Sequence, residues 1–237
     1  MHNFTSKNAS ESMFWNERFT ENYMPWDGAG VPLELQQFVQ DSEQAYSCFI
    51  PGCGLGYEVQ YLVQHDWNVQ AIDFAPAAVE KARLFLGPLG HHVQQADFFE
   101  FQTEYKTKHK TKHISKHISE HISEHKNEHK NEQMSDSAFN CIYERAFFCA
   151  LPPHLRVAIV TKWAQLLPVN GLLIGYFYLD DALPAGQPDI KGPPFLTTKH
   201  QLDLLLNEHF ECIEMRPAQA SISIFAGREF WMVWRKK

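Results

Sequence analysis

The sequence predicts an α/β fold, namely a seven-stranded, mostly parallel sheet with one antiparallel strand and helices on both faces. From Ser47 onwards, short β-type runs alternate with segments of helical periodicity, a pattern typical of parallel sheets covered by helices. A glycine-punctuated turn at residues 52–56 follows the first run, at the edge where such sheets bind ligands. The last two runs are joined without a helix, so we expect them to pair antiparallel.

The individual elements follow from local signals in chain order. Apolar residues at helical spacing predict helices after the first, second and fourth strands. Pro76 is expected in the first turn of the helix that follows the second strand, and Gly87-Pro88 is expected to end that helix. Thr198 and Gln201 are spaced as a capping box for a helix at residues 199–207. Strands are expected at residues 47–50, 68–73, 92–97, 139–144, 171–178, 210–215 and 230–235.

Residues before Ser47 do not follow this alternation. Residues 13–20 and 33–40 are predicted helices, and the segment Tyr23-Met24-Pro25-Trp26-Asp27-Gly28 is a turn between them. We interpret residues 1–45 as an N-terminal helical lid over a bound ligand. The whole chain, residues 1–237, is expected to form a single domain.

Composition narrows the classes of function. The chain has 237 residues, 44% hydrophobic content and a formal net charge of -7, so it offers no positive field to nucleic acid. No apolar run is long enough to span a bilayer, and no secretory leader is evident. The five cysteines form no CxxC pair, which fits a reducing cytoplasm. We therefore expect a cytoplasmic protein with neither nucleic acid nor a membrane as partner. A monomer that acts on a small-molecule acceptor is a further expectation, which composition does not determine.

Residues 105–133 are a low-complexity insertion rich in histidine and lysine. Histidine recurs at every fourth position among Lys, Ser, Glu and Asn, as expected of repeat expansion in a solvated surface segment. Two neighbouring histidines at this spacing on a helix can hold a metal such as zinc, nickel or copper. A histidine-rich metal-buffering protein is thus one alternative, although no carboxylate or cysteine completes a closed site.

The strongest chemical signal combines the glycine turn with two acids, each at the end of a strand. The turn lacks the third glycine of a pyrophosphate-binding G-x-G-x-x-G, which favours a cofactor without phosphates, such as S-adenosyl-L-methionine. Gly52 and Gly54 allow close backbone approach, and Asp73 can accept hydrogen bonds from the ribose hydroxyls. Phe74 can lie against the adenine, and Asp97 with Phe98 can meet its amino group.

Several short motifs together resemble one known family. They are Pro51-Gly52-Cys53-Gly54-Leu55-Gly56-Tyr57-Glu58, Ala71-Ile72-Asp73, Ala96-Asp97-Phe98-Phe99, Arg145-Ala146-Phe147-Phe148-Cys149-Ala150-Leu151-Pro152-Pro153 with Arg156, and Gly192-Pro193-Pro194-Phe195. The combination resembles the thiopurine S-methyltransferase superfamily. The P-G-C-G turn and Pro25-Trp26-Asp27 are closest to its thiol and halide methyltransferase branch. The likeness extends from about Phe14 to Trp234, apart from the insertion.

This resemblance implies a Rossmann-like class I methyltransferase fold with S-adenosyl-L-methionine as the methyl donor. Phe19 stands where the family usually carries a second tryptophan, so an aromatic wall remains without an indole N–H. Arg145 is expected either to orient the substrate or to hold the donor's carboxylate. A purely structural salt bridge from Arg145 to Asp73 or Glu144 is the competing interpretation. Matching motif by motif places donor contacts on Trp15, Phe19, Trp26, Gly52, Cys53, Gly54, Asp73, Phe74, Asp97, Phe98 and Arg145.

The acceptor is expected to be a small soft nucleophile. The fourth strand ends in Tyr143-Glu144-Arg145 rather than the N-P-P-Y or D-P-P-Y of enzymes that methylate amides and bases, which favours sulfur or a halide or chalcogen. In-line attack on the donor's methyl group then needs positioning but no strong base and no essential metal. The alternative, an O- or N-methyltransferase, needs a general base, for which His154 is the candidate.

Two further segments are candidates for the acceptor side of the pocket. Residues 192–195, Gly-Pro-Pro-Phe, lie beyond the fifth strand and are expected to form a stiff loop there or a plain surface turn. Tyr176 and Tyr178 alternate with Phe177 on that strand, so one face is expected to line the pocket and the other the core.

Overall fold

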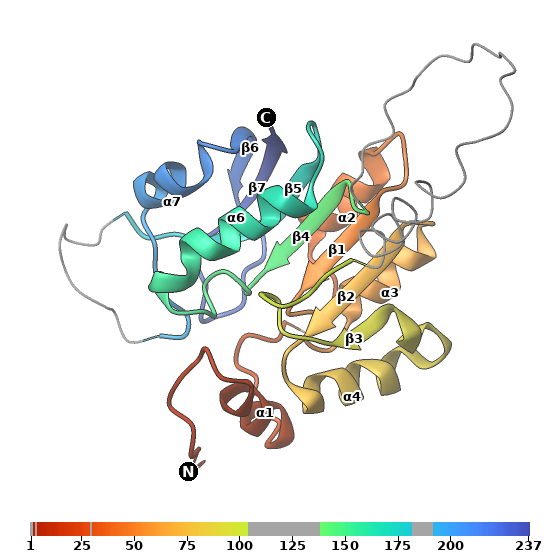
Figure 1. Ribbon diagram of the computed structural model, residues 1–237, viewed down its shortest axis with the longest axis vertical. Helices are drawn as coiled ribbons and strands as arrows, with labels where there is room; N and C mark the ends of the chain where they lie inside the picture. Colours follow the sequence, from red (N-terminus) through yellow and green to blue (C-terminus); the bar gives the residue numbers. More distant parts are fainter. Residues whose placement is uncertain (1, 3, 29, 104–137, 182–191) are drawn as a thin grey trace, which may run out of the picture.

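The computed structural model describes residues 2, 4–28, 30–103, 138–181 and 192–237. These residues form one seven-stranded sheet (Figure 1), in which every neighbouring pair is parallel except the two pairs made by the last strand. The predicted sheet with one reversed strand is therefore confirmed. Its spatial order is β3 (Val93–Gln95), β2 (Asn68–Asp73), β1 (Ser47–Pro51), β4 (Cys141–Arg145), β5 (Leu172–Tyr178), β7 (Glu229–Lys236) and β6 (Phe210–Pro217).

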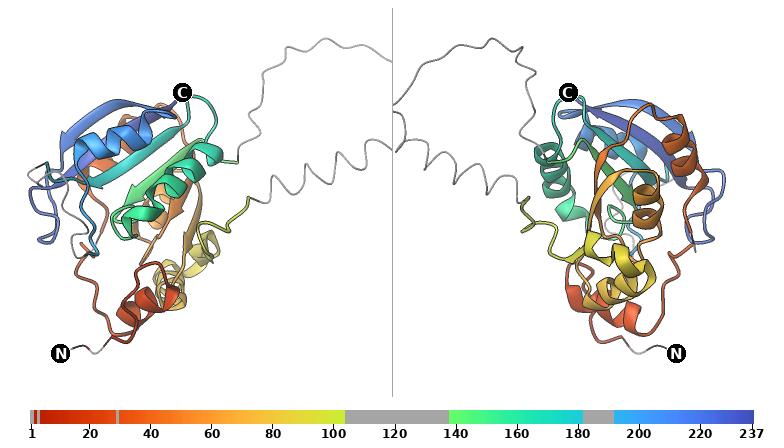
Figure 2. Two further views of the ribbon diagram at one scale, coloured as in Figure 1. Left: turned by 60° about the vertical axis from the view of Figure 1, so that its left-hand side comes forward. Right: turned by 90° about the vertical axis from the view of Figure 1, so that its right-hand side faces the viewer.

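Helices cover both faces of the sheet, as the alternation of elements predicted (Figure 2). On one face, α2 (Leu33–Asp41), α3 (Tyr57–Gln64) and α4 (Pro76–Leu86) share an apolar core with the strands. On the other face, α6 (Arg156–Leu166) and α7 (Lys199–Leu206) pack on the second core, where Trp163 is fully buried. The central strands are thus buried on both sides, and the carboxyl ends of the parallel strands form the edge where a ligand is expected.

The helix boundaries follow the local signals. Pro76 occupies the first turn of α4, and Gly87 ends it with φ 55°, a conformation that favours glycine. Thr198 caps α7 by accepting from the backbone N–H of Gln201, whose side chain accepts from the N–H of Thr198. The predicted capping box is therefore present.

Some boundaries differ from the sequence-based expectation. β3 ends at Gln95, before Asp97, because the Asp97 carboxylate accepts from the backbone N–H of Phe99 and turns the chain out of the sheet. The helix after Pro152-Pro153 begins as a short 3₁₀ turn, η2 (Pro153–Leu155), and becomes α-helical only at Arg156. A second 3₁₀ turn, η1 (Gly87–His92), follows α4.

The two N-terminal helices differ in what they contact. α1 (Ser12–Thr20) lies beyond the carboxyl ends of β1 and β2 and contacts α4 (Figure 1). In contrast, α2 buries Leu35 and Val39 in the core against the sheet and contributes nothing to the pocket described below. The expectation that residues 33–40 cover the ligand is therefore wrong, because their apolar side chains are needed to cover β5 and β7.

The histidine-rich insertion cannot be placed relative to this fold, because residues 105–133 lie outside the described residues. Its expected character as a surface segment therefore stays a prediction. A separate finding concerns membranes: within the described residues, no helix is both long enough and apolar enough to cross a bilayer.

Candidate active site

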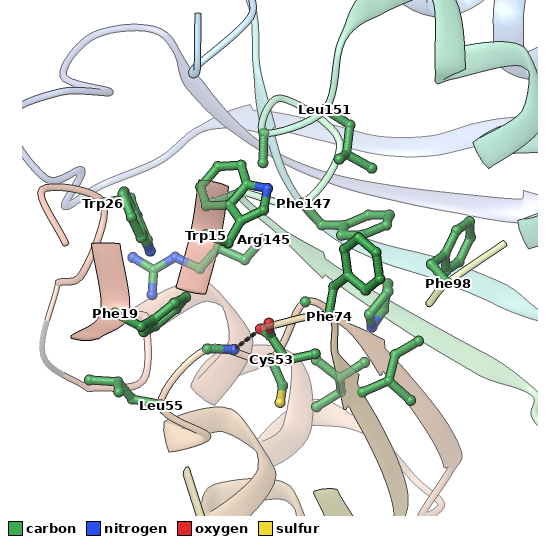
Figure 3. Close-up of a pocket in the computed structure, with 18 of the residues that line it drawn as sticks. Trp15, Phe19, Trp26, Cys53, Leu55, Phe74, Phe98, Arg145, Phe147 and Leu151 are labelled. Carbon is green, nitrogen blue, oxygen red and sulfur yellow. Dashed lines mark hydrogen bonds between the residues drawn. The ribbon is translucent and has the colours of Figure 1, made fainter. Parts of the chain in front are cut away.

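One pocket lies where β1, β2 and β4 end, beneath α1 and the turn that follows it (Figure 3). Three aromatic residues of the N-terminal segment lie on one side of it in this view, and Phe98 lies on the opposite side. All the residues that the sequence singled out for donor binding line this pocket: Trp15, Phe19, Trp26, Gly52, Cys53, Gly54, Asp73, Phe74, Asp97, Phe98 and Arg145.

The glycine turn after β1 brings bare backbone to the pocket wall. Gly52 and Gly54 have φ values of 64° and 55°, which side chains rarely tolerate. A Cβ on Gly54 would project into the pocket and meet only the ring of Phe19, 3.9 Å away. A Cβ on Gly52 would come within 2.8 Å of the Phe147 ring. At Gly54 the turn therefore leaves bare backbone that a ligand can approach closely, whereas at Gly52 the Phe147 ring leaves no room for a side chain.

Asp73 ends β2 at the floor of the pocket and is held by the turn itself. The backbone N–H of Gly54 donates to Oδ2 at 3.0 Å, and that of Ala75 donates to Oδ1 at 2.9 Å. Burial raises the pKa of the Asp73 carboxyl to about 6, although these two N–H groups lower it in part. The carboxylate is thus oriented by backbone donors and keeps further acceptor capacity for hydroxyl groups.

This raised pKa predicts a pH-dependent stability in the absence of donor. The pKa in the folded state, about 6, lies above the ordinary 3.8, so protonation of Asp73 favours folding. Its contribution is complete below about pH 4 and is lost as the pH rises through about 6, a change of about 3 kcal/mol in the free energy of unfolding. Urea denaturation at several pH values should show a decline between about pH 4 and 6 that is about 3 kcal/mol larger in the wild type than in Asp73→Asn, which keeps the contributions of the other buried carboxyl groups. Parallel pH profiles for the two proteins would contradict it.

The far end of the pocket is aromatic. Phe98 is buried against Phe49 and meets Phe147 edge to face, with ring centroids 4.9 Å apart. Phe74 continues β2 into the pocket, and its carbonyl accepts from the Ser12 hydroxyl of α1. This end can therefore enclose a flat heterocycle, with the Asp97 carboxylate beside it.

The side of the pocket formed by α1 and the turn after it carries three aromatic residues, two of which contact the third. Trp15 and Phe19 each meet Trp26 edge to face, with ring centroids 5.4 and 5.8 Å apart. The indole N–H of Trp15 donates to the carbonyl of Ala9, so this group is hydrogen-bonded within the N-terminal segment. This N-terminal segment therefore presents apolar ring surface to the pocket, and the edge-to-face contacts favour these ring orientations.

Arg145 ends β4 at the third side of the pocket. Its Nη1 lies 3.4 Å from Oε1 of Glu58, and its Nε lies 4.0 Å from Oε1 of Glu229. Nη2 would be 3.4 Å from a Cβ on Gly28, so the guanidinium reaches the turn that follows α1. The expected salt bridge from Arg145 to Asp73 or Glu144 is therefore not formed, because Glu58 and Glu229 are its partners instead. The alternation of side chains along β4 directs Glu144 to the opposite face of the sheet, where it accepts from the backbone N–H of Phe148.

The structure does not place the other acceptor-side candidates in the pocket. His154 lies exposed on η2. Tyr176 points into the core, where its hydroxyl donates to Glu34 at 2.8 Å, and Tyr178 packs on Phe225. The backbone N–H of Phe195 donates to the carbonyl of Cys149, a residue that does not line the pocket. None of these residues lines the pocket.

Sequence reasoning missed several residues that do line it. Glu58 and Tyr57 belong to the glycine-turn motif, and Phe147 and Leu151 belong to the motif after the fourth strand, yet no role was expected for any of them. Tyr143 also lines the pocket, and its hydroxyl donates to Glu58. A signal existed for Glu58, because an acid in the first turn of the helix after a glycine turn must lie near the ligand edge.

Solved structures share this fold at low sequence identity. The 1,6-didemethyltoxoflavin-N1-methyltransferase of Burkholderia thailandensis, solved with S-adenosylhomocysteine, aligns with a TM-score of 0.65 at 12% identity, over 95% of this chain and 87% of that one. A TehB-like SAM-dependent methyltransferase of Corynebacterium glutamicum aligns with a TM-score of 0.57 at 13% identity, over 94% and 98%. The sheet and its helices therefore form the Rossmann-like class I methyltransferase fold that the sequence predicted.

Curated proteins match over most of the chain. Thiocyanate methyltransferase 1 of Brassica oleracea is 24% identical over 94% of this chain and 84% of its own length. Probable thiol methyltransferase 2 of Arabidopsis thaliana is 24% identical over 99% and 89%. Thiopurine S-methyltransferase of Pseudomonas putida is 30% identical over 78% and 77%. Residues 10–237 match the family model described as thiopurine S-methyltransferase, and the chain therefore belongs to the thiopurine S-methyltransferase family.

Proposed function

We propose that this enzyme transfers the methyl group of S-adenosyl-L-methionine to a small soft nucleophile, a thiol or an anion such as thiocyanate or a halide. The observation that carries this proposal is the guanidinium of Arg145, which reaches the turn that follows α1 from the end of β4. Among the described residues that line the pocket, Arg145 is the only basic one. An anionic acceptor, or a thiol that ionises in the site, would find its counter-charge there.

The donor would occupy the remainder of the pocket. Asp73 would accept from the ribose hydroxyls, and Gly52, Cys53 and Gly54 would border the methionine portion. The adenine would lie among Phe74, Asp97 and Phe98 at the aromatic end, which lies opposite the N-terminal aromatic residues in Figure 3. When bound, the donor supplies an electrophilic methyl group on a sulfonium, so the protein must chiefly align an incoming nucleophile.

Three aromatic residues would close the site over both reactants. Trp15, Phe19 and Trp26 present apolar ring surface to the pocket, which excludes water and strengthens the interaction of Arg145 with an anion. Methylation of oxygen or nitrogen with His154 as the base is not supported, because His154 is exposed and does not line the pocket.

The cellular location and the partners of the enzyme are also proposed. Five free cysteines, four of them buried, are consistent with a reducing cytoplasm. We propose a monomer that acts on small molecules, without nucleic acid or a membrane as partner.

Acceptor identity is tested by a methyl-transfer screen. We expect turnover with an aliphatic thiol, 6-mercaptopurine, thiocyanate or iodide, because each offers a polarisable nucleophilic atom. Product methyl sulfides and methyl halides are measured by gas chromatography, and non-volatile products by mass spectrometry. Activity with a phenol or an amine, and with none of the soft nucleophiles, would overturn the proposal.

Arg145→Gln tests whether Arg145 binds the acceptor or holds the carboxylate of the donor. Loss of a charge-assisted hydrogen bond to an anionic acceptor should raise its KM about tenfold or more, because such a bond is worth about 1.5–3 kcal/mol. The affinity for S-adenosylhomocysteine, measured by calorimetry, should stay within a few-fold. A large loss of that affinity instead would assign Arg145 to the donor's carboxylate.

A further inference from the structure

Glu58 lies in the pocket beside Arg145, the only basic residue among the described residues that line it. It belongs to the first turn of α3, directly after Gly56 and Tyr57, and the φ of 82° at Gly56 closes the glycine turn. Its Oε1 lies 3.4 Å from Nη1 of Arg145 and 3.4 Å from the hydroxyl of Tyr143. The Glu58 side chain is 13% exposed and that of Arg145 is 15% exposed. A carboxylate and a cation are thus held side by side at the proposed reacting end of the pocket.

The proposed acceptors differ in whether they carry a proton. An aliphatic thiol has a pKa of about 8.5, so only a few per cent is ionised at neutral pH, although the thiolate is the nucleophile. Thiocyanate and halides are already anions. An enzyme for thiols therefore gains from a proton acceptor within the pocket, and an enzyme for halides does not.

The other carboxylates of the pocket are engaged differently. Asp73 accepts from two backbone N–H groups, those of Gly54 in the glycine turn and of Ala75 before α4. Asp97 accepts from the backbone N–H of Phe99, and Asp27 accepts from the Tyr57 hydroxyl at 3.5 Å in the turn that follows α1. Glu58 contacts the guanidinium of Arg145 and accepts from the hydroxyl of Tyr143, and both of these side chains line the pocket. Glu58 therefore lies next to the proposed anion site at Arg145.

We propose that Glu58 accepts the proton of thiol acceptors, while Arg145 stabilises the thiolate that forms. This proposal rests on the proposed methylation of soft nucleophiles and adds a catalytic group that only protonated acceptors need. The thiol S–H bond breaks, its proton passes to the Glu58 carboxylate, and the electron pair stays on sulfur. That pair forms the new bond to the methyl carbon, while the old carbon–sulfur bond breaks and leaves its pair on the departing sulfide. Glu58 then loses the proton to solvent.

The surroundings of Glu58 suit a proton acceptor. Burial raises the pKa of Glu58, and the neighbouring Arg145 and Tyr143 lower it in part. The other ionisable groups that face it are Cys53 of the turn and Tyr57 of α3. The carboxyl thus binds a proton more readily than an exposed glutamate, and the adjacent guanidinium favours its ionised form.

Glu58→Gln tests the proposal with two kinds of acceptor. We expect kcat/KM for an aliphatic thiol at neutral pH to fall about 100-fold or more, because general base catalysis typically contributes 10²–10⁴. The value for iodide or thiocyanate should stay within a few-fold. The thiol activity of the variant should recover as the pH approaches the thiol pKa of about 8.5, where the thiol ionises without help.

A binding measurement adds a readout that does not depend on turnover. In the complex with S-adenosylhomocysteine, a bound thiol should show thiolate ultraviolet absorbance with the wild type and not with Glu58→Gln. Glu58→Asp, which keeps the carboxylate, should restore part of both signals. Glu211→Gln is the matched control, since it removes a carboxylate from an exposed pair with Arg235 at 2.7 Å and should change neither signal.

The outcomes separate this proposal from the one on which it rests. Equal losses for thiol and halide, or a thiol activity that does not recover with pH, would overturn the role of Glu58 and leave the proposed function standing. A large loss of S-adenosylhomocysteine affinity in Glu58→Gln would instead assign the carboxylate to the donor's ammonium group. A wild type that methylates no soft nucleophile would reject the proposed function itself.

Discussion

Asp73→Ala is expected to lower the affinity for S-adenosylhomocysteine about 100-fold or more. The variant removes the carboxylate that would accept from both ribose hydroxyls, and hydrogen bonds to a charged group are worth about 1.5–3 kcal/mol each. It also removes the acceptor for the backbone N–H groups of Gly54 and Ala75, which loosens the glycine turn. Isothermal titration calorimetry measures the loss directly.

A second ligand shows whether the loss comes from the ribose contact. A dideoxy analogue of S-adenosylhomocysteine, which lacks the two ribose hydroxyls, should bind the wild type weakly. Asp73→Ala should bind this analogue and S-adenosylhomocysteine with about the same affinity. Glu80→Ala removes the same charge from an exposed site on α4 and should bind like the wild type. Wild-type affinity in a folded Asp73→Ala protein would reject the assignment of Asp73.

Gly175→Ala is expected to destabilise the fold strongly, because the added methyl group meets the neighbouring strand. Gly175 lies in β5 with φ 146°, in a region of backbone conformation that is essentially confined to glycine. A Cβ at this position would lie 1.8 Å from the carbonyl oxygen of Glu144 in β4. Overpacking and backbone strain together should cost roughly 4 kcal/mol, and urea denaturation measures the change in the free energy of unfolding.

Gly227→Ala separates the steric clash from the backbone conformation. Gly227 also has a positive φ, 75°, but a Cβ there would meet nothing within 4 Å. Only the conformational penalty of about 1–2 kcal/mol remains at this site. Equal losses in the two variants would show that contact with β4 is not what requires glycine at position 175. Because Glu144 precedes Arg145, a displaced β4 should also weaken binding of an anionic acceptor.

Local sequence signals were sufficient for the ends of several elements. β2 begins and ends at the expected residues, Asn68 and Asp73, because its alternation and the flanking turns are local properties. Pro76, Gly87 and the Thr198–Gln201 capping box act through the backbone of their own turns. The end of β3 was mispredicted, because the side chain of Asp97 competes for a backbone N–H that sequence periodicity does not reveal.

The candidate site was predictable in part for a topological reason. The carboxyl ends of parallel strands meet at one edge, so the glycine turn, Asp73 and Asp97 had to lie close together once the strands were placed. The partners of Arg145 were not predictable in this way. Glu58 and Glu229 are far from it in the sequence, and they meet it only because α3 and β7 are brought to the end of β4.

The amino-acid sequence by itself determined the alternation of strands and helices, the glycine turn and the acids that end its strands, since these depend on backbone conformation and short-range periodicity. Tertiary structure decided that α2 covers the sheet while α1 borders the pocket, and that Glu58 faces Arg145 and Tyr143. The physical reason is that apolar burial acts between distant segments, and the side chains that share a pocket are selected by the packing of the whole core.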